Sequence, residues 1–413
     1  MLLSPLLRHV MRRGTLRVID ADNQLHVFAG QEPWKTVTIH FHDRAVAREL
    51  LLNGPLKLGE TFMEGRLTVE DGSVYDLLEL VGCNLMLAPP HPVMRIGDII
   101  GRWLRKFQQH NPLWKSRQNV AHHYDLSDTL YNLFLDTDRQ YSCAYFNDSN
   151  DPLEEAQANK KRHLASKLRL ASGQKVLDIG SGWGGLALYL AQEADVEVTG
   201  ITLSVEQLRV AERRAQAMGL SDRVKFELID YRELTGRRFD RIVSVGMFEH
   251  VGVNQYPAFF QKVKELLSDD GIALLHSIGR ADGPGFTNPW IRKYIFPGGY
   301  SPAISEVVPV VEKTGLWITD IEVLRLHYAE TLKNWRARFL AQRERVKAIY
   351  DERFCRMWEF YLAGSEVAFR YQGHINFQMQ IAKRVDTVPL TRDYMFDWER
   401  AHAPKAKSKV HAA

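Results

Sequence analysis

The sequence has few cysteines, no long apolar run and no strong excess of charge. Three of its 413 residues are cysteines, Cys83, Cys143 and Cys355, and none forms a C-x-x-C pair. This spacing argues against a disulfide framework and against a cysteine-ligated zinc site. No apolar run approaches the roughly 18 residues that a membrane-spanning helix needs. The net charge of +4 is too small to indicate nucleic-acid binding.

Composition and length indicate a soluble globular protein of two or three domains. Apolar residues make up 45% of the chain and charged residues 25%, which are ordinary values. The apolar stretch at residues 1–7 is too short for a signal-peptide core and has no cleavage site after it. We therefore expect a cytoplasmic location.

The chain divides into four segments. Strand-like runs and turn signals predict a small α+β domain over residues 1–88, and the prolines of residues 88–92 mark its end. Residues 89–117 form a basic, aromatic linker. A larger domain with alternating strands and helices is predicted over residues 118–395. Residues 396–413 are predicted to be a basic, disordered tail.

The linker mixes basic and aromatic side chains. A composition of this kind suits an anionic, partly apolar surface such as a bilayer interface. It equally suits a solvated helix whose aromatics face the next domain, and charge runs are usually solvated faces. The residues concerned are Arg95, Arg102, Trp103, Arg105, Lys106, Phe107, Trp114, Lys115 and Arg117.

The larger domain is predicted to hold a parallel sheet. Strands are expected at residues 175–179, 196–201, 224–229, 241–245 and 272–278, with helical stretches between them. Such a pattern fits a doubly wound α/β sheet, in which ligands bind at the carboxyl ends of the strands. A Gly/Pro-rich insertion at residues 283–300 follows the fifth strand, and it is either a lid or substrate wall or a plain connector.

Residues 176–185, VLDIGSGWGG, join the first strand to a glycine turn and a helix. The glycines allow a tight turn and close approach of the backbone to a nucleotide-like cofactor. Gly180, Gly182 and Gly185 also fit a nicotinamide fingerprint, but that needs an acidic residue about 20 positions later. Residues 198–204, VTGITLS, contain none. Asp178 stands where an S-adenosylmethionine (SAM) methyltransferase motif places an acid, so SAM is favoured over NAD.

Four further motifs accompany the glycine turn: HYDLS at residues 123–127, QYSCAYF at 140–146, MFEHV at 247–251 and LHSI at 275–278. Together they resemble the cyclopropane-fatty-acyl-phospholipid synthase family, which includes the mycolic acid cyclopropane synthases, over about residues 118–395. The resemblance implies an α/β fold, with a doubly wound class I SAM-methyltransferase sheet, a helical cap and a small N-terminal α+β domain. That extension resembles the extra domain of the phospholipid-acting members, so we expect it to be lipid- or membrane-associated.

The resemblance also implies the reaction. A cis alkene in a phospholipid acyl chain attacks the methyl group of SAM, and the resulting cation loses a proton and closes to a cyclopropane ring. The family uses a bound bicarbonate as the base. Its site would be formed by the side chains of Glu249, His276 and Tyr328 and by backbone groups of Cys143 and Ile278. His and Tyr donate hydrogen bonds, whereas Glu accepts one from the bicarbonate hydroxyl.

The resemblance assigns ten residues to the cofactor. Tyr124 would cover the active site from the helical cap, and Tyr231 would cover the adenine ring, where the mycolate enzymes have a tryptophan. The remaining eight are Tyr141 and Ser142 near the methionine portion, Asp178, Gly180 and Gly182 on the turn, Thr202 and Gln207 near the ribose and adenosine, and Asp230 near adenine.

Other interpretations stay open. The product could be a methyl-branched or methylenated chain, or the enzyme could be a small-molecule O- or N-methyltransferase that needs no bicarbonate. A membrane-binding or lipid-carrying module without catalysis is a third possibility. Taken singly, His276 and Cys143 are typical structural residues, and His122 and His123 lack a third metal ligand, so no metal is predicted. The resemblance further implies a homodimer, peripherally associated with the inner membrane.

Overall fold

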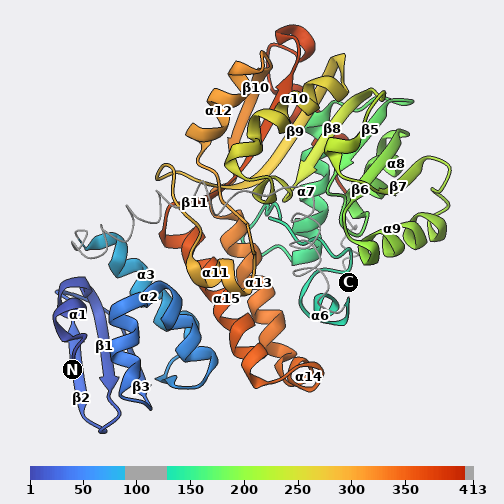
Figure 1. Ribbon diagram of the computed structural model, residues 1–413. Helices are drawn as coiled ribbons and strands as arrows, with labels where there is room; N and C mark the ends of the chain where they lie inside the picture. The colour runs from blue at the N-terminus through green and yellow to red at the C-terminus, as the bar shows by residue number, and fades with distance from the viewer. Residues whose placement is uncertain (89–127, 405–413) are drawn as a thin grey trace, which may run out of the picture.

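The structure, a computed structural model, describes residues 1–88 and 128–404. These residues form a small α+β domain and a larger α/β domain, which confirms the predicted fold class (Figure 1). The linker at 89–117, the residues His122, His123 and Tyr124, and residues 405–413 of the tail lie outside the described residues.

The N-terminal domain packs helices against a four-stranded sheet of order β2-β1-β3-β4. Along β3, Val37, Ile39 and Phe41 are buried while the residues between them are more exposed, as expected for a strand with one face on the core. The elements are α1 (Ser4–Val10), β1 (Arg13–Ile19), β2 (Leu25–Ala29), β3 (Glu32–Phe41), α2 (Ala45–Met63), β4 (Leu67–Asp71) and α3 (Val74–Leu87).

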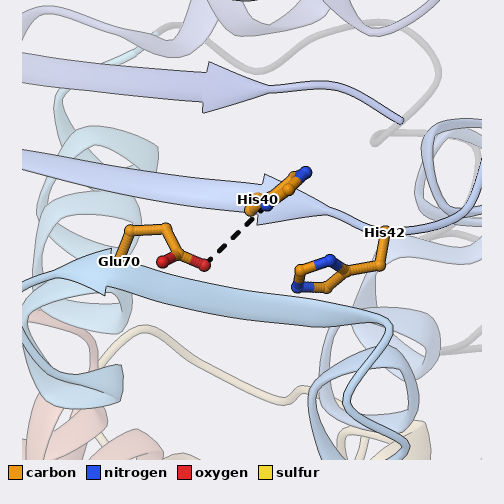
Figure 2. A group of neighbouring side chains, drawn as sticks. All are labelled: His40, His42 and Glu70. Atoms are coloured by element: carbon orange, nitrogen blue, oxygen red, sulfur yellow. Dashed lines mark ion pairs between the residues drawn. The ribbon is translucent and has the colours of Figure 1, made fainter. Parts of the chain in front are cut away.

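His40 of β3 and His42, just after the end of β3, lie beside Glu70 of β4 (Figure 2). Among the described residues, these three form the one group of His, Cys or acidic side chains whose ligand atoms all lie within 4.8 Å of one another. His40 Nδ1 lies 3.9 Å from Glu70 Oε1. The Thr68 hydroxyl lies 2.8 Å from His42 Nε2 and donates to Glu70 Oε1 over 2.6 Å. Thr68 therefore links His42 to Glu70 by hydrogen bonds, and His40 contributes a longer ion-pair contact.

The large sheet has seven strands in the order β10-β11-β9-β8-β5-β6-β7. The five strands from β9 to β7 are parallel, and chain order reverses on either side of β5. Strand β11 is antiparallel to both β9 and β10. The strands are β5 (Lys175–Ile179), β6 (Glu197–Thr202), β7 (Val224–Leu228), β8 (Phe239–Val245), β9 (Leu267–Arg280), β10 (Trp317–Val323) and β11 (His374–Ala382).

Helices cover both faces of this sheet. Neighbouring residues of β5 face opposite ways: Val176 packs with α7, α8 and α9, and Leu177 packs with α10 and α12. A separate helical cap has its own aromatic core. The helices are α7 (Leu153–Leu168), α8 (Gly185–Ala194), α9 (Val205–Ala217), α10 (Tyr256–Leu266), α12 (Ile304–Lys313) and α16 (Asp393–Ala401), and in the cap α6 (Asp128–Phe134), α11 (Pro289–Tyr294), α13 (His327–Ala341), α14 (Arg343–Ile349) and α15 (Glu352–Tyr371).

The glycine turn leaves β5 in a conformation that other residues rarely adopt. Gly180 has a φ of +83°, and a Cβ atom there would lie 2.9 Å from the Cβ of Met247. A side chain at this position would therefore strain the backbone and collide with the loop after β8. The turn keeps the carboxyl end of β5 open.

The sequence analysis missed two strands and ended the domain too early. All five predicted strands are present, but β10 and β11 were not predicted. β11 carries buried polar side chains such as Gln378 and Gln380, which obscure an apolar strand pattern. The predicted disordered tail from residue 396 is wrong over residues 396–401, which belong to α16. Trp398 packs on the apolar core beside α7, and Glu399 bonds His163, so this segment is ordered.

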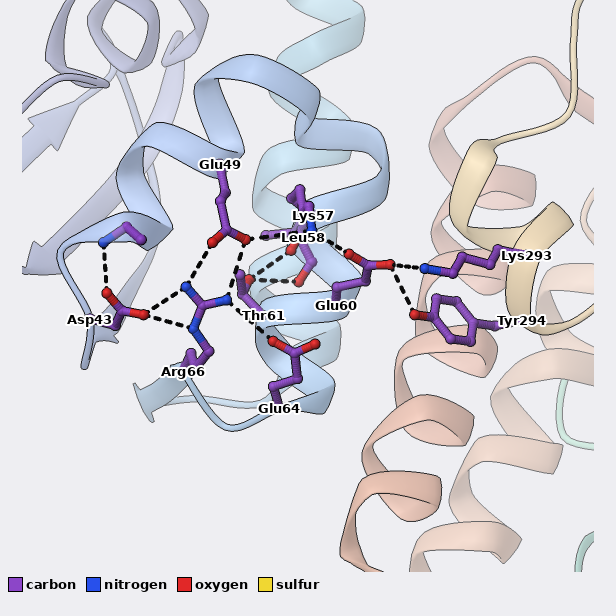
Figure 3. Close-up of polar contacts among 11 residues, drawn as sticks. Asp43, Glu49, Lys57, Leu58, Glu60, Thr61, Glu64, Arg66, Lys293 and Tyr294 are labelled. Carbon is purple, nitrogen blue, oxygen red and sulfur yellow. Dashed lines mark hydrogen bonds and ion pairs between the residues drawn. The ribbon is translucent and has the colours of Figure 1, made fainter.

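The N-terminal domain lies against the helical cap, beside α11 and α15 (Figure 1). The contact has an apolar part, in which Trp290 of α11 sits on Gly59 of α2. It also has a charged part centred on Glu60, whose carboxylate binds Lys293, Tyr294 and Lys57 (Figure 3). The predicted insertion at 283–300 thus contains α11 and contacts the other domain.

Candidate active site

A cavity opens at the carboxyl ends of β5 and β6, on the side where chain order reverses. Nine of the ten predicted cofactor residues line it, and the tenth, Tyr124, lies outside the described residues. The nine are Tyr141, Ser142, Asp178, Gly180, Gly182, Thr202, Gln207, Asp230 and Tyr231. The cavity therefore brings together residues that are up to 90 positions apart in the chain.

Asp178 presents a carboxyl group to this cavity with one oxygen unsatisfied. Only 2% of the residue is exposed, and Oδ2 has no hydrogen-bond partner among the described residues. Burial raises the pKa of Asp178 to about 7, although the charge of Lys160 opposes the shift. A buried, unpartnered carboxyl oxygen fits a ligand that carries an ammonium group.

Lys160 of α7 is a cavity residue that the sequence analysis missed. Its ammonium is fully buried and donates to Gln140 Oε1 over 2.6 Å and to Ser142 Oγ over 2.8 Å. These bonds hold the segment that carries Tyr141. Burial lowers the pKa of Lys160 to about 8. No sequence signal separates it from the surface lysines, because α7 buries side chains on every face.

The far end of the cavity contains two polar pairs. Thr202 Oγ1 donates to Gln207 Oε1 over 2.8 Å at the end of β6. Both oxygens of Asp230 accept from the guanidinium of Arg232, over 2.8 and 2.7 Å. Arg232 was also missed, and it holds the carboxylate next to Tyr231. These groups suit hydroxyl and ring-nitrogen partners of a nucleoside.

Aromatic side chains surround Tyr141. Its hydroxyl lies 2.8 Å from the Tyr361 hydroxyl, and its ring centroid lies 5.1 Å from Trp335 and 5.4 Å from Tyr131. Burial raises the pKa of Tyr141 well above its usual value, so the phenol stays neutral. The cap therefore adds an apolar, aromatic wall to the cavity.

Two of the predicted catalytic residues, Glu249 and Ile278, are in contact. Glu249 belongs to the 3-10 turn Phe248–His250, and its Oε1 accepts from the backbone N–H of Ile278 over 2.6 Å. We expected this N–H to donate to the bound anion, whereas here it orients Glu249. Oε2 is buried without a partner among the described residues. Burial raises the pKa of Glu249 to about 7, although the hydrogen bond from Ile278 acts to lower it.

His276 lies on β9, next to the loop that lines the cavity. The residue is 1% exposed, and its carbonyl accepts from the N–H of Gly246, which is a cavity residue, over 3.0 Å. Burial lowers the pKa of His276 well below its ordinary value, so the imidazole is neutral. Its Nε2 is buried and has no hydrogen-bond partner in the described part of the chain.

Cys143 and Tyr328 belong to the aromatic core of the cap. Cys143 is fully buried, which raises the pKa of its thiol, so the side chain is an inert thiol and not a nucleophile. Tyr328, at the start of α13, packs 4.6 Å from the ring of Phe369 and 5.9 Å from Trp335. Ile278 packs against the same core.

Lys160 links the two sets of predicted residues. Its charge acts on the carboxyl of Asp178, on the thiol of Cys143 and on the imidazole of His276. None of the five predicted catalytic residues lines the cavity itself, but Cys143 and Glu249 are chain neighbours of the cavity residues Ser142 and His250. Glu249 Oε2 and His276 Nε2 are each buried without a hydrogen-bond partner among the described residues. This combination suits a small oxygen-rich ion with a hydroxyl group.

Comparisons with known proteins place the chain in a family. The sequence model of the family described as "Mycolic acid cyclopropane synthetase" matches residues 112–379. The chain is 38% identical to the cyclopropane-fatty-acyl-phospholipid synthase of Escherichia coli K12 over 339 residues, covering 82% of this chain and 86% of that one. It is 36% identical over 394 residues to the tuberculostearic acid methyltransferase UfaA1 of Mycobacterium tuberculosis, covering 88% and 87% of the two chains.

A solved structure of the same family is also similar to this chain. The crystal structure of mycolic acid cyclopropane synthase CmaA1, complexed with SAH and CTAB, superposes with a TM-score of 0.60 and 34% sequence identity. The match covers 64% of this chain and 97% of that one.

Proposed function

The chain belongs to the mycolic acid cyclopropane synthetase family, and from that premise we propose that it forms cyclopropane rings in membrane lipids. In the proposed reaction, the cis double bond of an unsaturated phospholipid acyl chain receives a methylene group from SAM. The methyl carbon bonds to both alkene carbons and one proton is released. The observations that carry the proposal are the cavity that Asp178 lines and the buried Glu249 Oε2 and His276 Nε2, which have no hydrogen-bond partner among the described residues.

The cavity residues fit SAM. Asp178 would bind the ammonium of the methionine portion, and Thr202 and Gln207 would hold the ribose and adenosine. SAM supplies a methyl group on a sulfonium, which is a reactive electrophile with a good leaving group. The protein's part is to hold the methyl group and the alkene together and to exclude water. The aromatic wall around Tyr141 would help to hold the reactants and to exclude water. Its ring faces would also stabilise positive charge on the reacting chain.

The second set of residues fits an anion that takes up the released proton, and we propose bicarbonate on the strength of the family resemblance. Bicarbonate supplies a base that can leave the site after protonation. His276 Nε2 would donate to it, and Glu249 Oε2 would accept from its hydroxyl. Tyr328 and the backbone at Cys143 would complete the site, while Ile278 holds Glu249 in place.

A membrane location follows from the substrate, and the N-terminal domain supports it. No helix in the described ranges has both the length and the apolar character to cross a bilayer. The N-terminal domain nevertheless exposes apolar side chains, and two groups of them lie on helices. They are Leu51 and Leu52 in α2, and Leu85, Met86 and Leu87 at the end of α3. We propose peripheral binding at the inner membrane surface, and a homodimer as the resemblance implies.

A second product is also supported. UfaA1 is named as a methyltransferase and is almost as similar to this chain as the E. coli synthase. The same attack on SAM leaves a cation, and loss of a neighbouring proton without ring closure would give a methylenated or methyl-branched chain that keeps a double bond.

The test is incubation of the full chain with methyl-labelled SAM and liposomes of cis-unsaturated phospholipid, followed by fragmentation of the acyl chains in a mass spectrometer. We expect label in a ring at the former double bond, with turnover that falls when bicarbonate is removed. A labelled methyl branch would favour the second product. No transfer despite SAM binding would contradict both and favour a small-molecule methyltransferase.

A further inference from the structure

Gln378 lies directly beside His276 on the neighbouring strand. The two residues are Cα partners in the antiparallel pairing of β11 with β9. Gln378 is 1% exposed, and its side-chain amide bridges two groups. Its Oε1 accepts from Lys167 Nζ over 2.6 Å, and its Nε2 lies 3.1 Å from His276 Nδ1.

Lys167 determines which way this amide faces. The Lys167 ammonium also bonds the carboxylate of Glu322, whose pKa is lowered to about 2 by His163 and Lys167 despite its burial. An ammonium group has donors and no acceptor, so the atom of Gln378 that faces it must be the oxygen. The NH₂ group of Gln378 must then face His276.

The amide in turn determines the proton position on His276. An NH₂ group only donates, so His276 Nδ1 must offer a lone pair. A neutral imidazole carries one proton, and that proton must then lie on Nε2. This is the nitrogen that is buried without a partner among the described residues.

A chain of hydrogen bonds continues beyond Lys167 to the C-terminal helix. Glu322 of β10 lies 2.7 Å from His163 Nε2, and His163 Nδ1 bonds Glu399 of α16. Elements that meet only in the folded protein thus anchor Lys167 and, through it, the amide.

We propose that Gln378, oriented by Lys167, is a positioning residue that keeps His276 as the neutral Nε2–H form and so presents a hydrogen-bond donor to the active site. The inference rests on the proposed function only for the identity of the group that receives this hydrogen bond. A residue that merely filled space between β9 and β11 would have no effect on the histidine proton.

Two substitutions separate these roles. Gln378→Glu keeps the shape and the acceptor for Lys167, but it replaces the donor by an acceptor. We expect His276 to become protonated on Nδ1. Gln380→Glu is the matched control, because Gln380 is equally buried two residues along the same strand and bonds the Lys167 carbonyl and Tyr394, not His276.

The readout is the ¹⁵N NMR shift of His276 in the ligand-free full chain, labelled at histidine. Because the chain has 15 histidines, the His276 signals are assigned as those missing from His276→Asn. We expect an unprotonated Nδ1 and a protonated Nε2 in the wild type and in Gln380→Glu, and a protonated Nδ1 in Gln378→Glu. A protonated Nδ1 in the wild type overturns the proposal, and this result needs only the assignment variant His276→Asn to fold, not Gln378→Glu.

Kinetics complete the test. In Gln378→Glu, labelled methyl transfer at saturating SAM should fall by roughly tenfold or more, while the Kd for SAM changes less than about twofold. Gln380→Glu should keep the wild-type rate. Unchanged turnover in a variant whose His276 proton has moved would overturn the functional role. Should no lipid be methylated at all, the NMR result still decides the tautomer, so failure of the proposed function is recognised separately.

Discussion

Trp290 of α11 lies so close to Gly59 of α2 that a Cβ atom on residue 59 would be 2.4 Å from the indole Nε1. The indole is fully buried and donates to the sulfur of Met63, 3.2 Å away. Only a glycine lets the two domains approach this closely. Since α11 belongs to the insertion after β9, this contact joins the N-terminal domain to a segment near the cavity.

We expect Gly59→Ala to destabilise the protein. The added methyl group overpacks the contact with Trp290, which typically costs about 1–3 kcal/mol, and this outweighs the helix propensity of up to ~1 kcal/mol that alanine gains. The melting temperature should fall. Gly54→Ala on the same helix is the control, because nothing lies within 4 Å of the added atom. Equal melting temperatures in the two variants would refute the packing argument.

Glu60→Gln should weaken the domain contact near neutral pH but not in acid. Burial would raise the pKa of Glu60, but hydrogen bonds from Lys293, Lys57 and Tyr294 lower it to about 2 (Figure 3). Its stabilising effect is therefore full above its unfolded pKa of about 4.5 and is lost as the pH falls towards 2. The difference in melting temperature between wild type and variant should shrink over this range.

Glu64→Gln is the control for that experiment. Glu64 lies on the same segment, pairs with Arg66 over 3.2 Å and is 40% exposed at its side chain. An exposed pair contributes little, so we expect little change at any pH. If the difference in melting temperature between wild type and Glu60→Gln did not change with pH, the charge of Glu60 would not stabilise the domain contact.

SAM affinity should depend on pH through Asp178. With its pKa raised to about 7, the carboxyl is protonated below that pH and must ionise to bind an ammonium group. We expect affinity measured by calorimetry to fall as the pH is lowered, approaching tenfold per pH unit. Asp178→Asn should bind weakly without this slope, whereas Asp195→Asn, at an exposed helix end, should behave as the wild type. If the SAM affinity of Asp178→Asn still fell with decreasing pH, a group other than Asp178 would cause the pH dependence.

Lys160→Met should reduce SAM affinity by about tenfold or more. The change removes charged hydrogen bonds to Gln140 and Ser142 and leaves buried acceptors unpaired. The neighbouring Lys161 provides the comparison, because Asp138 keeps its bond to Arg214 when Lys161 is replaced by Met. Similar Kd values for the two variants would show that Lys160 is not required for the site.

Glu249→Gln and Tyr328→Phe should each lose turnover, by roughly a hundredfold or more, while the Kd for SAM is kept. Glu249→Gln replaces one acceptor oxygen by a donor, and Tyr328→Phe removes a hydroxyl without changing the ring. Labelled methyl transfer to liposomes measures the first quantity and calorimetry the second. Near-normal turnover in both variants would remove these residues from the proposed anion site.

Local patterns in the sequence predicted much of the fold. The turn at Gly180 and the five parallel strands were predicted because strand spacing and glycine position are properties of neighbouring residues. The nine predicted cofactor residues that line the cavity came from the family resemblance. The antiparallel β10 and β11 escaped prediction, because Gln378 and Gln380 break the apolar pattern with polar groups that only the neighbouring elements satisfy.

The sequence by itself therefore determined the fold class, the glycine turn and the edge of the sheet at which the cavity opens. Tertiary structure alone decided that Lys160 is buried against Gln140 and Ser142 at the cavity, and that Gln378 lies beside His276, 102 positions away in the chain. The register of β11 against β9 sets that contact, and no local pattern encodes a register between strands so far apart. A buried polar side chain has a role only through its partners, and the fold chooses the partners.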